Sequence, residues 1–252
     1  MQGARFVRVE LRRPDLRTAF PRRFAARLKG QTVVRLDRRA KYLLAVLSSS
    51  ETLLMHLGMS GSLRAGAQAE ANRHDHVVFH MSSGATVTFN DPRRFGFMDL
   101  LTPKQLTSHP TLSRLGPEPL SAAFDAAALA RACRGKKTSL KAALLDQRVV
   151  AGLGNIYVSE ALHVARLSPM RQASTIATKS GAPRPAGVRL AAAVKQVLDD
   201  AVARSAGRRY RTARFRVYDR AGERCLRRGC SGSIAQRTQA GRSTYYCPIC
   251  QR

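Results

Sequence analysis

The chain has 252 residues and a formal net charge of +28, because 44 lysines and arginines stand against 16 aspartates and glutamates. Such an excess of positive charge is costly unless a polyanion neutralises it, so we expect a nucleic acid or an anionic membrane surface as the partner. The sequence has no apolar run of about 18 residues and no recognisable signal peptide, so we expect a cytoplasmic, nucleoid-associated protein without membrane spans. The alternative is a basic surface without a partner, produced by an arginine-rich composition.

The first hundred residues contain six segments that are typical of strands. They are short, rich in β-branched and aromatic residues, and separated by Ser, Gly, Asn and Asp. The segments are 31–36, 41–47, 52–57, 76–81, 85–90 and 95–101. The short connections between them favour antiparallel neighbours, and a β-sandwich or flattened barrel would bury their apolar faces.

The pattern changes after a linker with two prolines at residues 115–120. Apolar residues then recur at helical spacing in 124–133, 139–147, 155–166 and 187–204. In the last of these segments, the spacing predicts one apolar face made of Val194, Val197, Leu198, Ala201 and Val202. From Arg214 onward the pattern returns to strands.

Four of the five cysteines lie close together near the end of the chain. Four residues separate Cys225 from Cys230, two separate Cys247 from Cys250, and sixteen lie between the pairs. Two such pairs at the ends of a hairpin can complete a tetrahedral Zn²⁺ site, which would be structural because no position is left for water. Four unrelated cysteines are the alternative, but the pairing and the lack of a secretory signal favour a metal over disulfides.

Three glycine-containing segments suggest contacts with a ligand. Residues 150–154 form a glycine-rich turn before a helix expected to begin at Asn155, where backbone N–H groups could bind phosphate; such turns more often serve packing. Met59 lies between glycines and is expected at an exposed tip, although methionine is more often a core residue. Arg93 and Arg94 directly precede Phe95, and two such arginines alone would be ordinary surface charges.

Seven blocks of the sequence, in order over nearly the whole chain, closely resemble the bacterial formamidopyrimidine-DNA glycosylase family. The blocks are 37–44, 56–64, 74–79, 90–97, 115–120, 136–162 and 241–251. The resemblance implies an α+β chain with an N-terminal β-sandwich (1–114), a helix–two-turn–helix domain (115–212) and a C-terminal zinc-finger β-hairpin (213–252). It also implies a monomer that binds double-stranded DNA containing oxidised or abasic nucleotides. Members of the family excise oxidised purines, such as formamidopyrimidine and 8-oxoguanine, and cut the strand at the abasic site.

The resemblance further implies a role for each matched residue. A base inside a duplex must be extruded before it can be excised, and Met59, Arg93 and Phe95 match the side chains that fill the space it leaves. Lys41 and Arg242 match the catalytic lysine and arginine that assist strand cleavage. Glu160 matches an acidic position to which we assign a structural role. The residues expected to bind DNA are His74, Arg93, Arg94, Lys136, Lys141 and Asn155.

Two departures from the family pattern change what we expect. Family members begin with Pro-Glu and use the proline amine as the nucleophile, whereas this chain begins Met-Gln-Gly. We expect an earlier start codon, and we expect the chain as written to bind abasic DNA but to be impaired in excision. The second departure is a shortened lesion-capping loop between residues 206 and 215, which resembles the endonuclease VIII branch and favours a looser lesion readout.

Two other functions fit part of the sequence. A non-catalytic binder of damaged or abasic DNA would use the same side chains without the missing nucleophile. An RNA-binding zinc-ribbon protein would explain the positive charge, but it would leave Met59, Arg93 and Phe95 without a role.

Overall fold

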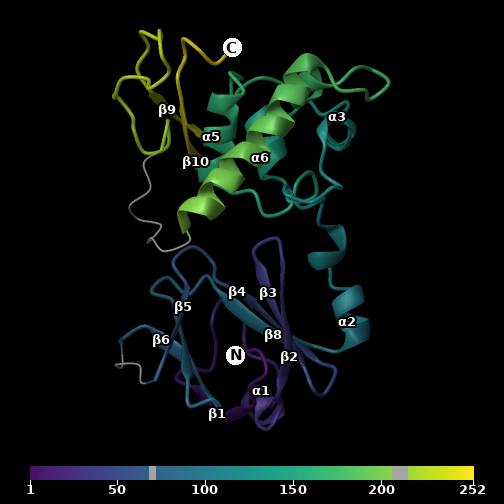
Figure 1. Cartoon of the computed structure of the whole chain (residues 1–252), viewed down its shortest axis with the longest axis vertical. Helices are drawn as coiled ribbons and strands as arrows, with labels where there is room; N and C mark the ends of the chain where they lie inside the picture. The colour runs from purple at the N-terminus through teal and green to yellow at the C-terminus, as the bar shows by residue number, and fades with distance from the viewer. Residues whose placement is uncertain (68–71, 206–214) are drawn as a thin grey trace. The chain divides into compact units, whose positions relative to one another are not determined.

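The computed structural model describes residues 1–67, 72–205 and 215–252 (Figure 1). Backbone contacts divide the chain into two compact units, Met1–Ser113 and Arg114–Arg252. The first unit consists mainly of strands, and the second contains the longer helices and a terminal hairpin. The expected α+β class is therefore confirmed. The helical segment and the hairpin, which the sequence suggested as separate domains, form one unit by these contacts.

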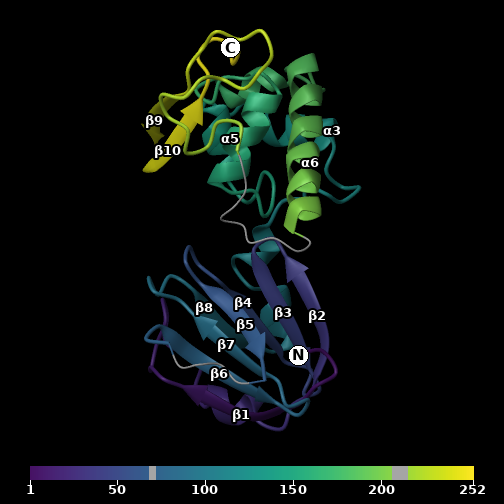
Figure 2. The same ribbon diagram turned by 60° about the vertical axis from the view of Figure 1, so that its left-hand side comes forward.

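The first unit is a sandwich of two four-stranded antiparallel sheets (Figure 2). One sheet has the order β1-β6-β7-β5, with β1 at Phe6–Leu11, β6 at Asp75–Met81, β7 at Thr86–Asn90 and β5 at Ser62–Gly66. The other has the order β2-β3-β4-β8, with β2 at Val33–Arg39, β3 at Tyr42–Leu47, β4 at Thr52–His56 and β8 at Phe97–Leu101. Buried side chains of both sheets, including Phe6, Phe79, Leu53 and Met98, share one hydrophobic core.

The sandwich contains elements that the strand pattern did not predict. These are β1, β5, the short helix α1 (Phe24–Leu28) and the short helix α2 (Pro103–Thr107). α2 begins with a capping box, since the Thr102 side chain accepts a hydrogen bond from the Gln105 backbone and the Gln105 side chain accepts one from the Thr102 backbone. This reciprocal pair satisfies two N–H groups at the start of the helix.

The second unit is built around four helices. They are α3 (Ala126–Cys133), α4 (Leu140–Leu145), α5 (Asn155–Val164) and α6 (Pro185–Ser205), with the 3₁₀ turn η2 (Ala173–Ile176). Another 3₁₀ turn, η1 (Leu112–Arg114), lies at the boundary between the two units. Asp125 and Ser139 cap the first turns of α3 and α4 with their side-chain oxygens, as residues of these types commonly do. Among the described residues, no helix is both long and apolar enough to cross a membrane.

The apolar face predicted for α6 is only partly correct. Val194 and Val197 are buried, but Val202 is 61% exposed. The buried face also contains Leu190, Ala191 and Ala193. These side chains pack in the hydrophobic core that α3, α4 and α5 also line, so burial shifts toward the first half of the helix.

The chain ends in a hairpin of β9 (Ala235–Gln239) and β10 (Arg242–Tyr246). Its two turn residues, Ala240 and Gly241, both have positive φ, at 47° and 70°. Two-residue turns of this kind match the twist of the strands they join. The hydrophobic cluster of this region is small, and its buried members are Val217, Cys225, Ile234, Tyr245 and Cys247.

Candidate nucleic-acid interface and metal site

One end of the sandwich collects the functional residues predicted in the first unit. In one sheet, Tyr42, His56 and Phe97 pair across neighbouring strands, and in the other sheet Ser62, Asn90 and Asp75 do the same. The loops 57–61 and 91–96 cross from one sheet to the other at this end. The structure therefore brings together Lys41, Met59, His74, Arg93, Arg94 and Phe95.

The two crossing loops pack against each other and expose apolar tips. Met59 is 72% exposed and Phe95 is 40% exposed, while the Arg93 guanidinium lies 4.7 Å from the centre of the Phe95 ring. A Cβ atom at Gly58 would lie 2.5 Å from the backbone nitrogen of Gly96, so no side chain fits between the loops. The exposed tip predicted for Met59 is confirmed.

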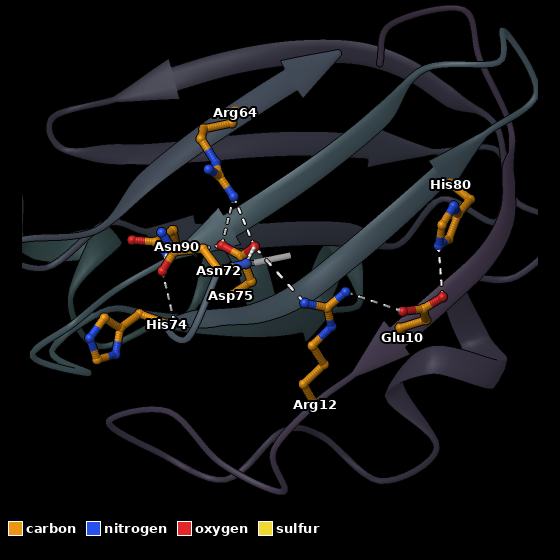
Figure 3. Close-up of polar contacts among 8 residues, drawn as sticks. All are labelled: Glu10, Arg12, Arg64, Asn72, His74, Asp75, His80 and Asn90. Atoms are coloured by element: carbon orange, nitrogen blue, oxygen red, sulfur yellow. Dashed lines mark hydrogen bonds and ion pairs between the residues drawn. The ribbon is translucent and has the colours of Figure 1, made fainter. Parts of the chain in front are cut away.

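A buried carboxylate fixes the segment that carries His74 (Figure 3). Asp75 is 3% exposed. It accepts hydrogen bonds from Arg64, at 2.8 Å to each oxygen, from the Asn72 backbone at 2.8 Å and from the Asn90 side chain at 2.9 Å. The backbone N–H of His74 donates to the Asn72 side chain. The His74 ring is thus presented from an ordered backbone, while the ring itself points away from Asp75.

Lys41 lies in the two-residue turn between β2 and β3. The other turn residue, Ala40, has a φ of 53°, and Lys41 is exposed. Burial lowers the pKa of His56, and the positive charges of Lys41 and Arg17 lower it further. The His56 ring also stacks on Phe97, and its lowered pKa favours the neutral form of the imidazole.

In the second unit, α5 begins at Asn155, as the glycine-rich turn predicted. Gly154 is the N-cap and provides no side-chain cap, and the first N–H groups of a helix have no carbonyl partner within it. The Asn155 side chain donates a hydrogen bond of 2.9 Å to the Ser243 carbonyl in β10, and its own Oδ1 is buried with no hydrogen-bond partner among the residues that the structure describes. A helix start of this kind can bind phosphate.

Lys141 lies beneath the hairpin rather than at the surface. Its side chain is buried, and its ammonium donates hydrogen bonds to the Ser243 carbonyl at 2.9 Å and the Thr244 hydroxyl at 2.6 Å. Burial, together with the nearby charge of Arg242, lowers the pKa of Lys141 to about 8. The Ser243 carbonyl therefore accepts hydrogen bonds from both Lys141 and Asn155. These bonds fix the backbone next to the exposed Arg242. The phosphate contacts of Lys141, Lys136 and Arg242 stay predictions.

The sulfur atoms of Cys225, Cys230, Cys247 and Cys250 all lie within 4.8 Å of one another. The distances are 3.9 Å between Cys225 and Cys250 and 3.6 Å between Cys230 and Cys247. These are far too long for disulfides. A tetrahedral ion with metal–sulfur bonds of about 2.3 Å separates its sulfur ligands by about 3.8 Å, which fits this cluster.

The hairpin region is attached to α5 by two further side chains that bond to backbone groups. Glu160 is 4% exposed and accepts hydrogen bonds from the backbone N–H groups of Arg216, Val217 and Tyr218. Arg227 donates to the His163 carbonyl at 2.6 Å near the end of α5. The structural role expected of Glu160 is confirmed, and Arg227 adds a contact that the sequence did not indicate.

Some predictions concern residues outside the described part. The shortened lesion-capping loop lies largely within 206–214, which the structure does not describe.

The sequence reasoning missed Asp75 and Asp91, because a single acidic residue beside a strand is common in turns.

Comparisons with known proteins agree with the resemblance. Residues 1–98 match the formamidopyrimidine-DNA glycosylase N-terminal domain, and residues 115–211 match the helix–two-turn–helix domain of the same enzymes. Formamidopyrimidine-DNA glycosylases from a Bradyrhizobium strain and from Rhodopseudomonas palustris are 54% and 55% identical to the chain, covering 100% of it and 94% of each relative.

Solved structures show the same likeness. The Lactococcus lactis formamidopyrimidine-DNA glycosylase bound to DNA with an abasic site has a TM-score of 0.88 at 28% identity, covering 100% of this chain and 94% of that one. A related enzyme in complex with DNA containing carbocyclic 8-oxoguanine has a TM-score of 0.86 at 29% identity, with the same coverage. The chain belongs to the formamidopyrimidine-DNA glycosylase family.

Proposed function

We propose that this chain acts in base-excision repair as a DNA glycosylase that removes oxidised purines and cuts the strand at the abasic site. The observation that carries the proposal is the exposed tip of Met59, Arg93 and Phe95, at the same end of the sandwich as Lys41 and His74. The direct test is release of the free base from a duplex containing formamidopyrimidine or 8-oxoguanine, followed by strand breakage, by protein that carries the family's Pro-Glu start. If that protein binds such DNA but releases no base, it is a binder of damaged DNA instead.

The side chains at the tip have complementary tasks in this proposal. Extruding a base and unstacking its neighbours costs a few kcal/mol, and inserting Phe95 and Met59 offsets part of that cost by covering the exposed base faces. Arg93 carries a planar guanidinium that can hydrogen-bond the edge of the orphaned base, which a lysine ammonium does less specifically. Lys41, exposed in the turn before β3, would act near the sugar of the extruded nucleotide.

The second unit would hold the DNA backbone. Arg242 supplies an exposed cation, and Asn155 supplies a side chain and a helix start whose N–H groups favour phosphate. Arg242 lies in β10, and the Asn155 side chain donates a hydrogen bond to the carbonyl of the next residue, Ser243. This arrangement gives one anion-binding surface from residues far apart in the sequence.

We propose that Cys225, Cys230, Cys247 and Cys250 hold one structural Zn²⁺. Four thiolates occupy all positions of a tetrahedral ion, which then stabilises the fold and takes no part in the reaction. The support is the spacing of the sulfur atoms and the small hydrophobic cluster around them.

Salt dependence and two substitutions distinguish contacts with the DNA backbone from contacts with a base. We expect the affinity for duplex DNA to fall steeply with salt, and Arg242→Ala to weaken binding to all duplexes and reduce the salt slope by about one phosphate contact. Arg93→Ala should mainly reduce the preference for abasic over intact DNA, because its contact is with a base. Fluorescence anisotropy at several salt concentrations measures both. Equal losses of Arg93→Ala on intact and abasic duplexes would show that its assignment is wrong.

Lys141 should make DNA binding depend on pH. Its pKa is lowered to about 8 in the free protein, and a nearby phosphate favours the charged form. Binding should therefore take up a proton above pH 8, so affinity should fall between about pH 8 and 10. Lys141→Met should bind more weakly at pH 7.5 and lose this extra pH dependence. An unchanged pH profile in Lys141→Met would refute the role.

A further inference from the structure

We infer that Asp91 and Ser60 are positioning residues that lock the Met59 loop to the Arg93–Phe95 loop, so that both tips enter DNA as one unit. The inference rests on the proposed function, because it concerns how the tip fills the duplex. Neither residue carries an exposed apolar or cationic group of its own. Their role follows from what they join.

The Asp91 carboxylate is the centre of the link. It is fully buried. One oxygen accepts a hydrogen bond of 2.5 Å from the Ser60 hydroxyl, and the other accepts one of 2.8 Å from the Gly96 backbone. Ser60 directly follows Met59, and Gly96 directly follows Phe95, so one carboxylate connects the neighbours of both apolar tips.

The Ser60 hydroxyl makes a second connection between the loops. While it donates to Asp91, it accepts a hydrogen bond of 3.2 Å from the backbone N–H of Arg93. The same hydroxyl therefore fixes the third residue of the tip. The loop 91–96 already has a hydrogen bond that closes its own turn, from the Arg94 N–H to the Asp91 carbonyl. The bonds of the Ser60 hydroxyl are therefore not needed to close that turn, and they connect the two loops.

The packing of the loops explains why a link is useful. Gly58 and Gly96 bring the two backbones into direct contact, and neither glycine has a side chain that could hold the loops in register. Met59 and Phe95 are both exposed, so they contribute little packing in the free protein. Fixing the loops before DNA arrives removes an ordering cost that binding would otherwise include.

Ser60→Ala is the sharpest test, because it removes the bridge and leaves Asp91 bonded to Gly96. The probes are an intact duplex and one carrying a tetrahydrofuran abasic analogue, with 2-aminopurine as the orphaned base. We expect Ser60→Ala to lose about five- to tenfold in affinity for the abasic duplex, from two lost hydrogen bonds, with little change on intact duplex. The change in 2-aminopurine fluorescence when Ser60→Ala binds should be smaller than the change when the unsubstituted chain binds. Ser60→Thr, which keeps the hydroxyl, should restore both.

Ser48→Ala is the matched control. The Ser48 hydroxyl also accepts from a backbone N–H, that of Thr32, and donates to a side-chain oxygen, that of Gln31, but it lies away from the tip loops. It should behave as the unsubstituted chain. If Ser60→Ala keeps both the abasic preference and the fluorescence signal while Arg93→Ala loses the preference, the inference is overturned and the proposed function stands. If the unsubstituted chain shows no preference for the abasic duplex, both fall together.

Discussion

Removing the metal from the four-cysteine site is expected to abolish binding to duplex DNA, although none of the cysteines lies at the hairpin turn. The hydrophobic cluster around Val217, Ile234 and Tyr245 is small, and a region with so little core depends on its metal for folding. Once the hairpin unfolds, Arg242 is no longer held next to α5, and the Ser243 carbonyl no longer accepts hydrogen bonds from Lys141 and Asn155. The loss should therefore include the anion-binding surface of α5.

Chelation followed by anisotropy with labelled duplex measures this effect, and elemental analysis of fresh protein should give one zinc per chain. Cys230→Ser should lower both zinc content and DNA affinity. Cys133→Ala is the control, since Cys133 is buried in the core of the helices and should leave the zinc content unchanged. A zinc content well under one per chain in fresh protein, or full binding after chelation, would contradict the assignment.

The sequence predicted most elements whose patterns are local, although β1, with the sequence FVRVEL, has such a pattern and was missed. The six strand segments were recognisable because β-branched and aromatic residues are concentrated in them. The strand β5, with the sequence SLRAG, has no such composition and owes its conformation to pairing with β7. Its formation depends on a partner strand that lies 20 to 28 positions further along the chain, which no local pattern contains.

In the candidate site, too, features set by neighbouring residues were predicted and features set by distant residues were not. Exposure of Met59 followed from its flanking glycines, and the start of α5 at Asn155 followed from the turn before it. The burial of Lys141 did not follow, because the hairpin that covers it is about a hundred residues further along the chain. Asp75 and Asp91 were missed for the same reason, since Arg64, which donates to Asp75, and Ser60, which donates to Asp91, belong to other strands and loops.

Glu160→Gln should destabilise the second unit far more than its small change in size suggests. One Glu160 oxygen accepts from Val217 and Tyr218, and the other accepts from Arg216. Glutamine has one side-chain oxygen, which can replace only one of the two carboxylate oxygens. Its NH₂ group then takes the place of the other oxygen and faces a backbone N–H donor. Because hydrogen bonds to a buried charged group contribute about 1.5 to 3 kcal/mol each, we expect a loss of about 2 to 3 kcal/mol in the free energy of unfolding.

Denaturation followed by circular dichroism, with zinc retention measured alongside, tests this expectation. Residues 216–218 lead directly to Cys225, so loosening them should also speed zinc loss and weaken the DNA contacts that depend on Arg242. Glu223→Gln is the matched control, because Glu223 lies in the same region but is mostly exposed and pairs only with Arg220 among the interactions described; an exposed pair of this kind contributes little. If the two variants proved equally stable and retained zinc equally well, Glu160 would not be what attaches the hairpin to α5, and the attachment would depend on Arg227 and on the contacts at Ser243 instead.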